Sequence, residues 1–383
     1  MKKFVFIVLG MMTFSGVYAQ VKLITANNEF AFKFFKATKP DSSNYFISPF
    51  SLNLALAVAN EGAVSTTRKE MDELLCVKDI EDRAEGFQKL YKERSGLYLA
   101  NSVWISNGIR INKTYKQTIE DKYHSMVFNF DKRNIPAASL EMNRWVSNKT
   151  YQNITELSGL SPNSMLNILN AVYFVGEWET PFNKKNTAQR FFYGINGVTV
   201  AADFMKAQDF YQYYEDADVQ SLVLDYKENY SMIVMLPKER YGISRLEEKM
   251  NSEYLNEVLN LGSSKDVIVS LPKFKIETEM HPKLEIMKMG YGTMFSDRAD
   301  FSGISQVDKL KIDRITHKTF IEIDEVKTEA VAVSRVEMIR IGSVVSMTEP
   351  QPPVVSTANH PFVFFIVDNR TRAIIFIGKY VKS

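Results

Sequence analysis

The spacing of apolar residues predicts helices in the first third of the chain. Apolar side chains recur at helical spacing in residues 27–39 and in two successive stretches of residues 51–76, where Ser51 is the candidate cap. The same spacing is found in "INKTYKQTIEDKY" and "SLEMNRWVSNKTY", and later in "GISRLEEKMNSEYLNEVLNL" and in "HPKLEIMKMG", which Gly290 ends. Each segment is therefore expected to turn one apolar face towards a core.

Strand patterns dominate the remainder of the chain. Alternation of apolar and polar residues predicts strands in "LYLANSVWIS", "QSLVLDY" and "YSMIVMLPK", and the unbroken apolar run "MLNILNAVYFVGEW" predicts a strand buried on both faces. In "DVIVSLPKFKIETE" Pro272 indicates an edge strand or a bend. "KTFIEIDE" is a further strand, and "HPFVFFIVDNRTRAIIFIGKY" is a hairpin that turns at "DNRT". Because helices and strands do not alternate regularly, we expect one large α+β domain.

Composition limits the classes of partner. Of the 383 residues, 45% are hydrophobic and 24% charged, which suits a sizeable packed core rather than a disordered chain. The 47 basic and 45 acidic residues leave a formal net charge of +2. Such a balance gives no general attraction to nucleic acid or to an anionic membrane, so neither is expected as a partner.

The N-terminus predicts export. Lys2 and Lys3 precede a short apolar run that small residues follow, with Val17 and Ala19 placed for cleavage before Gln20. The run is shorter than the roughly 20 residues of a membrane span. We therefore expect residues 1–19 to be a signal peptide, with a buried first helix as the alternative, and a mature protein that is periplasmic or secreted.

Few residues suggest catalysis, metal binding or disulfide formation. The only cysteine, Cys76, excludes an intrachain disulfide and is expected to be a small buried residue at a helix end. The four histidines are scattered without neighbouring ligands, which predicts no metal site. The sequence motifs of α/β-hydrolases, nucleotide-binding loops and zinc proteases do not occur. We expect neither enzymatic activity nor a cofactor, although a triad assembled from distant residues stays open because triads are recognised by geometry.

Eight motifs follow one another through nearly the whole mature chain: "NYFISPFSLNLALAVANEGA", "MNRWVSNKT", "LNAVYFVGEWETPF", "MIVMLPK", "LPKFKIE", "MFSDRADFSGIS", "THKTFIEIDE" and "NHPFVFFIVDNRTRAIIFIGK". In this order they resemble the serpin family of serine proteinase inhibitors, and the third is similar to the serpin motif NAxYFKGxWxxPF. The resemblance, together with the leader, implies a bacterial exported serpin. It implies one α+β domain of residues 20–383 with three β-sheets, about nine helices and an exposed reactive loop at about residues 325–355. It also implies a monomeric proteinase inhibitor with a metastable native state.

The resemblance also assigns roles to buried polar residues. It implies a shutter beneath the main sheet, and a breach residue where the mobile loop first enters the sheet: Ser48, Ser51, Asn170 and His317 for the shutter, and Trp178 for the breach. Small polar groups and an imidazole within apolar runs have to hydrogen-bond one another, which fits the shutter. For Trp178, ordinary aromatic packing in the core is an equally good interpretation.

The segment between residues 328 and 341 has the pattern of a strand, although it lies where a loop is expected. Every second side chain, up to the last, is uncharged and mostly small or apolar: Thr328, Ala330, Ala332, Ser334, Val336, Met338 and Arg340. The intervening set carries three charges, and no proline or glycine interrupts the segment. Alone, the pattern favours an ordinary native strand. The serpin resemblance instead implies a loop that becomes a central strand after cleavage.

The implied mechanism is suicide inhibition. A target serine proteinase, or a cysteine proteinase as the alternative, would cleave the loop and form an acyl-enzyme, and the freed segment would insert into the main sheet. Burial of the small and apolar side chains should contribute roughly 5 kcal/mol. New ladder hydrogen bonds should add on the order of 10 kcal/mol. The protein's own residues would perform no chemistry.

The scissile bond follows from the spacing that is usual in the family. Counted from Glu325, it lies between Ile341 and Gly342, and Arg340 is the first charge on the face to be buried. Ile341 favours elastase-like or chymotrypsin-like targets, whereas Arg340 keeps a trypsin-like target open. Because the segment from Gly342 to Pro361 is longer than in many relatives, later positions are alternatives: Val344, Val345 and Met347.

The hinge of the loop departs from the family at one position. The resemblance places the hinge at Glu325, Lys327, Thr328, Glu329, Ala330, Ala332 and Ser334. Lys327 stands where inhibitory serpins usually have glycine, and its smaller backbone freedom is expected to slow insertion. The residues from Thr328 onwards match an inhibitory hinge, so an inhibitor is favoured. A non-inhibitory serpin that acts as a binding or carrier module is the alternative, and an unrelated exported enzyme is the third hypothesis.

Overall fold

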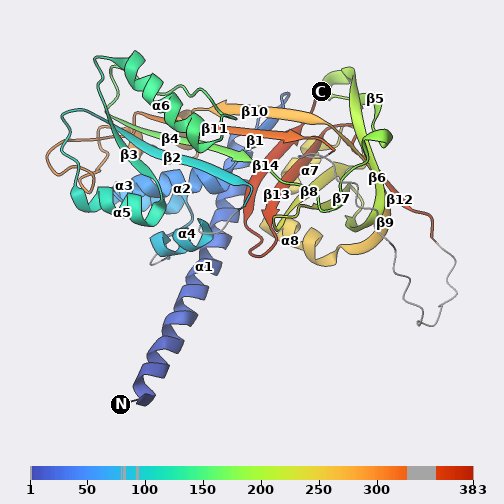
Figure 1. Ribbon diagram of the computed structural model, residues 1–383, viewed down its shortest axis with the longest axis horizontal. Helices are drawn as coiled ribbons and strands as arrows, with labels where there is room; N and C mark the ends of the chain where they lie inside the picture. Colours follow the sequence, from blue (N-terminus) through green and yellow to red (C-terminus); the bar gives the residue numbers. More distant parts are fainter. Residues whose placement is uncertain (1, 79, 81–82, 92–94, 326–350, 383) are drawn as a thin grey trace.

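The computed structural model describes residues 2–78, 80, 83–91, 95–325 and 351–382 (Figure 1). Within these residues there are nine α-helices and three short 3-10 helices. The α-helices are α1 (Lys2–Thr38), α2 (Pro49–Asn60), α3 (Ser65–Leu74), α4 (Arg83–Tyr91), α5 (Lys113–Tyr123), α6 (Ile135–Lys149), α7 (Ile243–Lys249), α8 (Ser252–Leu261) and α9 (Lys283–Lys288). The 3-10 helices are η1 (Lys184–Asn186), η2 (Ile195–Gly197) and η3 (Thr293–Phe295).

The strands are β1 (Tyr45–Ile47), β2 (Leu97–Ser106), β3 (Met126–Phe130), β4 (Leu166–Phe174), β5 (Ala188–Tyr193), β6 (Thr199–Glu215), β7 (Val219–Asp225), β8 (Tyr230–Pro237), β9 (Ser263–Pro272), β10 (Phe274–Met280), β11 (Arg314–Ile323), β12 (Val354–Thr357), β13 (Phe362–Asp368) and β14 (Ile374–Tyr380). One sheet has five strands in the order β10-β11-β4-β2-β3, and its central strands β11 and β4 are parallel. The other sheet follows β1-β14-β13-β8-β7-β6-β9-β12, with β5 beside β6.

The expected α+β class is confirmed, but the hydrogen-bonded sheets number two rather than three in the described residues. The reason is the 17-residue strand β6, which pairs with β5 near its start and with β7 near its end. One continuous strand thereby joins two arrays that would otherwise be separate sheets. The expected loop is also shorter at its end, because β12 begins at Val354.

Several predicted boundaries move for local reasons. The helix expected at residues 27–39 begins at Lys2, and Figure 1 shows its N-terminal part projecting from the rest of the molecule. The long helix predicted across "GISRLEEKMNSEYLNEVLNL" divides into α7 and α8, because the Asn251 side chain accepts the backbone N–H of Tyr254 and caps a new helix. Pro272 does mark a break, since it ends β9 in one sheet and β10 follows in the other.

None of the helices that the structure describes combines the length and the apolar character that a membrane span needs. The signal peptide expected in residues 1–19 stays a prediction.

Helix α2 lies at the centre of the fold, and all of its residues are buried. It contacts β2 and β4 of the five-stranded sheet and β14 of the other sheet. Its cap is Ser48 rather than the predicted Ser51: the Ser48 hydroxyl oxygen accepts the backbone N–H of Ser51 at 3.1 Å, and Pro49 starts the helix.

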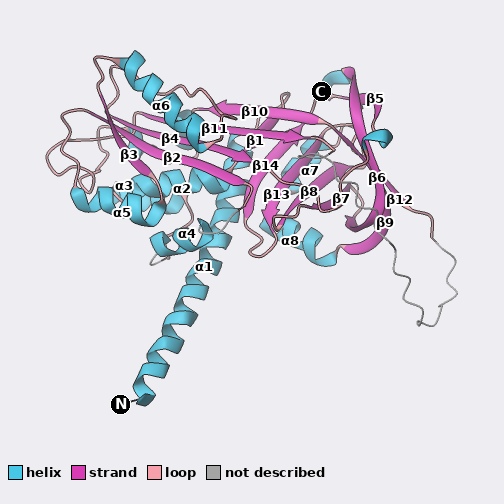
Figure 2. Cartoon of the chain, viewed as in Figure 1, coloured by secondary structure: helices cyan, strands magenta, loops and turns pink. Residues whose placement is uncertain are grey.

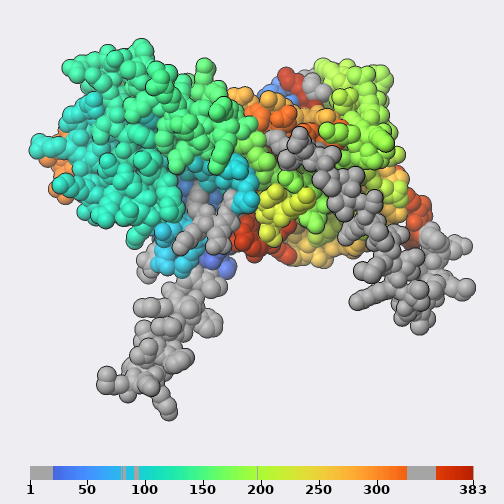
Figure 3. All heavy atoms as spheres, viewed as in Figure 1, coloured from blue at the N-terminus to red at the C-terminus, as the bar shows by residue number. Residues whose placement is uncertain are grey.

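Helix α6 covers the opposite face of the five-stranded sheet (Figure 2). Ala138, Met142 and Val146 recur at four-residue spacing and form its buried face. They pack with Trp104 and Leu169 in a second, smaller core. In Figure 3 the teal and green atoms of this part of the sequence cover the strands of that sheet. The five-stranded sheet is therefore enclosed on both faces.

Candidate functional site

The candidate site is the seam between β4 and β11 in the centre of the five-stranded sheet. The strands pair directly, from Arg314 opposite Asn167 to Phe320 opposite Tyr173. Every residue of β4 is buried. Because side chains alternate along a strand, successive facing pairs point to opposite faces, one towards α2 and the other towards α6. No other strand lies between β4 and β11 over these paired residues.

The predicted shutter residues meet on the α2 face of the seam. His317 lies directly opposite Asn170, and its Nδ1 hydrogen-bonds the Asn170 side-chain oxygen. The other ring nitrogen, Nε2, lies 3.1 Å from the backbone nitrogen of Ser48 and accepts its N–H. Asn170 Nδ2 donates to the Ser51 hydroxyl at 2.5 Å. The structure thus brings the four residues into one network.

The shutter requires a neutral imidazole. Since Nε2 of His317 accepts a hydrogen bond, the single ring proton lies on Nδ1 and is donated to Asn170. His317 is fully buried, and burial lowers its pKa from 6.5 to about 3. The histidine is therefore a hydrogen-bonding group of the seam and not a proton donor for chemistry at neutral pH.

Sequence reasoning missed one member of the shutter. Asn101 on β2 lies opposite Asn170 on the other side of β4 and accepts a hydrogen bond from its side-chain nitrogen. It lies within the alternating segment "LYLANSVWIS", and a polar residue in the middle of that strand pattern is the signal that would have identified it. The network therefore spans β2, β4, β11 and the start of α2.

Trp178 lies at the end of the seam where β11 ends. Its indole N–H donates to the backbone oxygen of Asp324 at 2.9 Å. Its ring stacks on Tyr226 with centroids 4.3 Å apart and meets Phe182 edge-on. The ring therefore packs in the core while its N–H holds the first residue after β11, and the breach role of Trp178 stays a prediction.

Glu325, the one predicted hinge residue that the structure describes, is buried and anchored by an ion pair with the partly exposed Lys273. It is only 3% exposed. Its carboxylate lies 2.8 Å from the Lys273 ammonium and accepts the Thr187 hydroxyl at 2.7 Å. Burial opposes its ionisation, but these bonds outweigh burial and lower the pKa of Glu325. The chain leaves β11 from a fixed point.

Lys273 and Thr187 were not predicted. No pattern in a single sequence links them to Glu325, because each lies far from it along the chain. The remaining hinge residues and all candidate scissile positions lie outside the described residues: Lys327, Thr328, Glu329, Ala330, Ala332, Ser334, Arg340, Ile341, Gly342, Val344, Val345 and Met347.

Other candidate groups have structural partners. In the described part of the chain, no three histidine, cysteine, aspartate or glutamate side chains are grouped so that they could hold a metal ion. His360 Nε2 lies 2.7 Å from the Pro237 backbone oxygen. Cys76 is half-buried rather than fully buried, and burial raises the pKa of its thiol.

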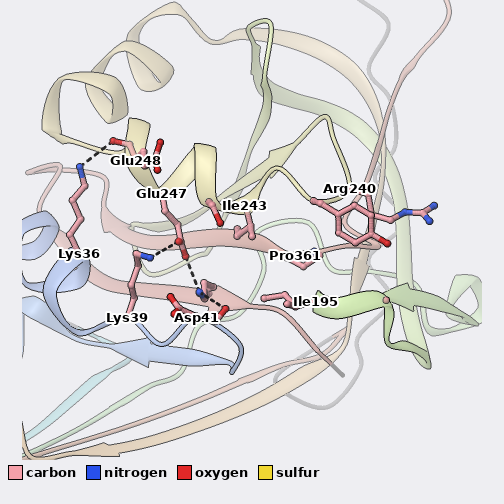
Figure 4. Close-up of a pocket in the computed structure, with 13 residues that line it drawn as sticks. Lys36, Lys39, Asp41, Ile195, Arg240, Ile243, Glu247, Glu248 and Pro361 are labelled. Carbon is pink, nitrogen blue, oxygen red and sulfur yellow. Dashed lines mark hydrogen bonds and ion pairs between the residues drawn. The ribbon is translucent and has the colours of Figure 1, made fainter.

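A pocket of about 820 Å³ lies between the end of α1, α7 and the segment before β6 (Figure 4). On its floor the Glu247 carboxylate pairs with the ammonium groups of Lys39 and Lys379, at 2.6 and 2.9 Å. The Arg240 guanidinium stacks over the ring of Tyr193, 3.9 Å from its centroid. On the floor of the pocket, both lysines thus pair with the same carboxylate.

Comparison with known proteins identifies the class. Residues 25–383 match the family model described as serpin (serine protease inhibitor). An uncharacterised serpin-like protein of Thermococcus kodakarensis is 34% identical, over 94% of this chain and 85% of that protein. Intracellular coagulation inhibitor 2 of Tachypleus tridentatus is 32% identical, over 93% of this chain and 90% of its own length.

Solved structures agree with this assignment. The thermophilic serpin tengpin in its native state superposes with a TM-score of 0.84 at 30% identity, over 94% of both chains. Human thyroxine-binding globulin in complex with thyroxine gives a TM-score of 0.85 at 26% identity, over 95% of this chain and 99% of that one. The fold is that of a protein class named for proteinase inhibition. The chain belongs to the serpin family.

Proposed function

We propose that the protein is a suicide inhibitor of serine proteinases, with cysteine proteinases as a second class of target. The observation that carries the proposal is the direct parallel pairing of β4 with β11, at whose end Glu325 holds the start of the loop. The sequence after Glu325 has the alternation of a strand. The segment with the strand pattern thus follows β11, which is one of the two strands between which it could insert.

Strand direction supports insertion between β4 and β11. A segment that turns back after Glu325 runs antiparallel to β11. Because β4 is parallel to β11, the same segment is also antiparallel to β4. Insertion would therefore exchange one parallel ladder for two antiparallel ladders, and parallel pairing is slightly less stable per residue. This exchange supplies a driving force.

The proposed reaction uses the catalytic residues of the target. The target's serine attacks the carbonyl carbon of Ile341, the Ile341–Gly342 peptide bond breaks, and Gly342 leaves with a new amino terminus. An ester then joins Ile341 to the proteinase. Insertion of the segment up to Arg340 pulls on this ester and distorts the proteinase's oxyanion hole, so that hydrolysis of the ester is no longer stabilised. The inhibitor is consumed in one turnover.

The class of target is proposed from the residues at the expected scissile bond. Ile341 fits the apolar primary pockets of elastase-like or chymotrypsin-like enzymes, and Arg340 fits a trypsin-like enzyme if the cut falls one residue earlier. We propose that the protein is exported, because the sequence of residues 1–19 has the order of a signal peptide. We also propose that it acts as a monomer, as the resemblance implies.

The test is a panel of elastase-like, chymotrypsin-like, trypsin-like and papain-like proteinases. At least one should form a covalent complex that survives boiling in detergent. Mass spectrometry of the released C-terminal peptide should give Gly342 as its first residue. A proteinase whose catalytic serine is replaced by alanine is the control and should form no such complex. Cleavage of the loop by every proteinase, without formation of a covalent complex, would contradict the proposal.

The alternative function is a carrier, as the name of one structural neighbour, thyroxine-binding globulin, suggests. The pocket between α1 and α7 offers the necessary volume, although its floor is occupied by the ion-paired Glu247. A carrier that does not insert its loop should show no increase in thermal stability after the loop is cut. An inhibitor should become markedly more stable, so a melting curve before and after cleavage separates the two.

A further inference from the structure

The pocket at the end of α1 has the size of a small-molecule site (Figure 4). Its volume is about 820 Å³. Pockets that bind small organic ligands measure roughly 300–1,000 Å³. The fold lines it with four parts of the chain: the end of α1, the turn before β6, the loop from β8 into α7 with α7 itself, and the chain at β13 and β14. Among the described residues that line it, none belongs to β4 or β11, so the pocket is separate from the seam.

One side of the pocket is apolar. Ile195, Ile243 and Pro361 lie there, and Figure 4 shows all three on the same side of the ion-paired floor. Tyr241 also lines the pocket and is 67% exposed. An apolar ligand body that packs against these side chains would be removed from water together with them, which favours binding.

The charged side chains that line the pocket sum to a net charge of +1. Four are cations and three are anions: Lys36, Lys39, Arg240 and Lys379 against Asp41, Glu247 and Glu248. The buried Glu247 and Lys379 cancel each other. Four of the others are exposed, two of each sign, so water screens them. Only the half-buried Lys39 remains, and the interior of the pocket therefore favours an anion over a cation of the same shape.

Glu247 cannot neutralise both of the lysines that share it. The ammonium groups of Lys39 and Lys379 lie 2.6 and 2.9 Å from its two carboxylate oxygens. The Lys379 side chain is only 1% exposed, whereas that of Lys39 is 20% exposed, so a ligand can approach Lys39 but not Lys379. An ammonium has three donors, and the bond to Glu247 uses one of those on Lys39. Lys39 thus keeps donors for a second carboxylate.

Lys36 adds a further cation to the charged side of the pocket. It lies three residues before Lys39, and residues at this spacing at a helix end share one side. Its ammonium donates to the backbone oxygen of Glu248 at 3.3 Å, the bond that Figure 4 shows between α1 and α7. A carbonyl oxygen does not cancel the charge of an ammonium group. The end of α1 therefore presents two ammonium groups to the pocket.

We propose that this pocket binds a small organic anion, whose carboxylate is held by Lys39 and whose apolar body, about the size of two fused rings, packs against Ile195, Ile243 and Pro361. Lys379 is a positioning residue, because it shares the charge of Glu247 and so leaves Lys39 able to bind the ligand. The inference goes beyond the proposed inhibitory function and does not depend on it.

The test is isothermal titration calorimetry of the full chain with three probes that share one ring system: 2-naphthoate, naphthalene-2-carboxamide and 2-naphthylmethylammonium. The carboxylate should bind about tenfold more tightly than the neutral amide, because its hydrogen bond from Lys39 is charge-assisted. The cationic probe should bind most weakly, and salt should lower the affinity for the carboxylate. Equal affinity for the three probes, or no binding of 2-naphthoate, would overturn the proposal.

Lys39→Gln should lower the affinity for 2-naphthoate about tenfold and leave that for the carboxamide nearly unchanged. Glu247 keeps Lys379 as its partner in this variant, so the fold should be retained. The matched control is Lys33→Gln, which removes the same charge from the same helix. The Lys33 ammonium donates to the Tyr291 hydroxyl at 2.5 Å and does not line the pocket. Equal losses in both variants would mean general attraction to a positive surface and would overturn the site.

Ser244→Trp tests the location of the bound probe. Ser244 lines the pocket and is exposed on α7, so an indole there should fill the space without changing a charge. Binding of 2-naphthoate should be lost, and binding that persists would place the probe elsewhere and overturn the proposal. The variant should form covalent complexes with proteinases as the wild type does. The calorimetry and the complex assay therefore report failure of this site and failure of the proposed function separately.

Discussion

His317 on β11 and Asn170 on β4 lie directly opposite each other and share a hydrogen bond across the line along which the sheet would open. The bond depends on a neutral imidazole, because the second ring nitrogen accepts the backbone N–H of Ser48. A charged imidazole would have to donate from both nitrogens, and Ser48 offers it a donor and no acceptor. Protonation of His317 would therefore remove its hydrogen bond from the Ser48 N–H, which links the seam to the start of α2.

This arrangement predicts a loss of stability in mild acid. The pKa of His317 is about 3 in the folded state and 6.5 in its ordinary range, so the unfolded state takes up the proton first as the pH falls. The buried, neutral His317 therefore makes its full contribution to the free energy of unfolding above pH 6.5. As the pH falls from 6.5 towards 3, this contribution is lost by up to about 1.4 kcal/mol per pH unit. Urea denaturation at pH 7.5 and at pH 5 measures the loss.

The variant His317→Gln removes the titrating group, so the difference in unfolding free energy between the two pH values should become smaller. The control is His124→Asn at the end of α5, a left-handed cap position that asparagine tolerates and that lies away from the seam. It should retain the wild-type difference. Equal pH dependence in all three proteins would contradict the assignment.

A second prediction concerns the ion pair between Glu325 and Lys273. Glu325 is buried, whereas the Lys273 side chain is about one third exposed, so solvent screens part of the attraction. We expect a coupling free energy of about 1–2 kcal/mol in a double-mutant cycle of Glu325→Gln and Lys273→Gln, measured by urea denaturation. Since the pKa of Glu325 is lowered by folding, this contribution should fade below about pH 4.5, its ordinary range.

The exposed pair Lys311–Asp297 provides a control for this measurement. Its atoms approach as closely, at 2.7 Å, but the Asp297 side chain is 89% exposed. Asp297→Asn should therefore change stability much less than Glu325→Gln does. If the two substitutions had equal effects, the hinge would not be anchored as the structure indicates.

Much of the fold could be predicted from local patterns. The alternation of "LYLANSVWIS" gives the bounds of β2, and the apolar run around Asn170 contains the buried strand β4. Strand β6 was missed, because its exposed aromatic residues obscure the alternation; Phe210 is 71% exposed. The break between α7 and α8 depends on one asparagine within an otherwise continuous helical pattern.

The candidate site likewise contains residues that could be predicted from the sequence and residues that could not. The resemblance named the shutter residues, and their polar character within apolar runs fits mutual hydrogen bonding. The pair Glu325–Lys273 and the pair Lys39–Glu247 join positions far apart in the sequence. A single sequence contains no signal that two distant polar residues will contact each other, because the topology of the sheets determines which residues become neighbours.

A third prediction concerns Lys327 in the hinge. Glycine at this position would widen the backbone conformations open to the turn after Glu325 and should speed insertion. Lys327→Gly is expected to lower the number of inhibitor molecules consumed per proteinase molecule trapped, measured by titration of residual activity. Lys327→Ala removes the charge and the long side chain without the added backbone freedom. If alanine has the same effect as glycine, backbone freedom is not the cause.

The last prediction tests which face of the loop becomes buried. In the alternating pattern Thr328 belongs to the set that enters the interior of the sheet, and Glu329 belongs to the set that faces water. Thr328→Arg places a charge into the sheet interior, where an unpaired charge costs several kcal/mol. The variant should still be cut at the same bond, but insertion should stall near its start. It should behave as a plain substrate, with cleavage and no covalent complex on denaturing gels.

The neighbouring substitution Glu329→Arg provides the matched control. It introduces the same side chain one residue later, but on the face that carries charges in the wild type, so it should leave complex formation nearly unchanged. The pair separates insertion from recognition, because both substitutions lie far upstream of the scissile bond and introduce the same side chain. Trapping by Thr328→Arg at the wild-type level would refute the strand assignment of this segment. Loss of trapping in both variants would mean that the face assignment is wrong and that any arginine in the hinge blocks it.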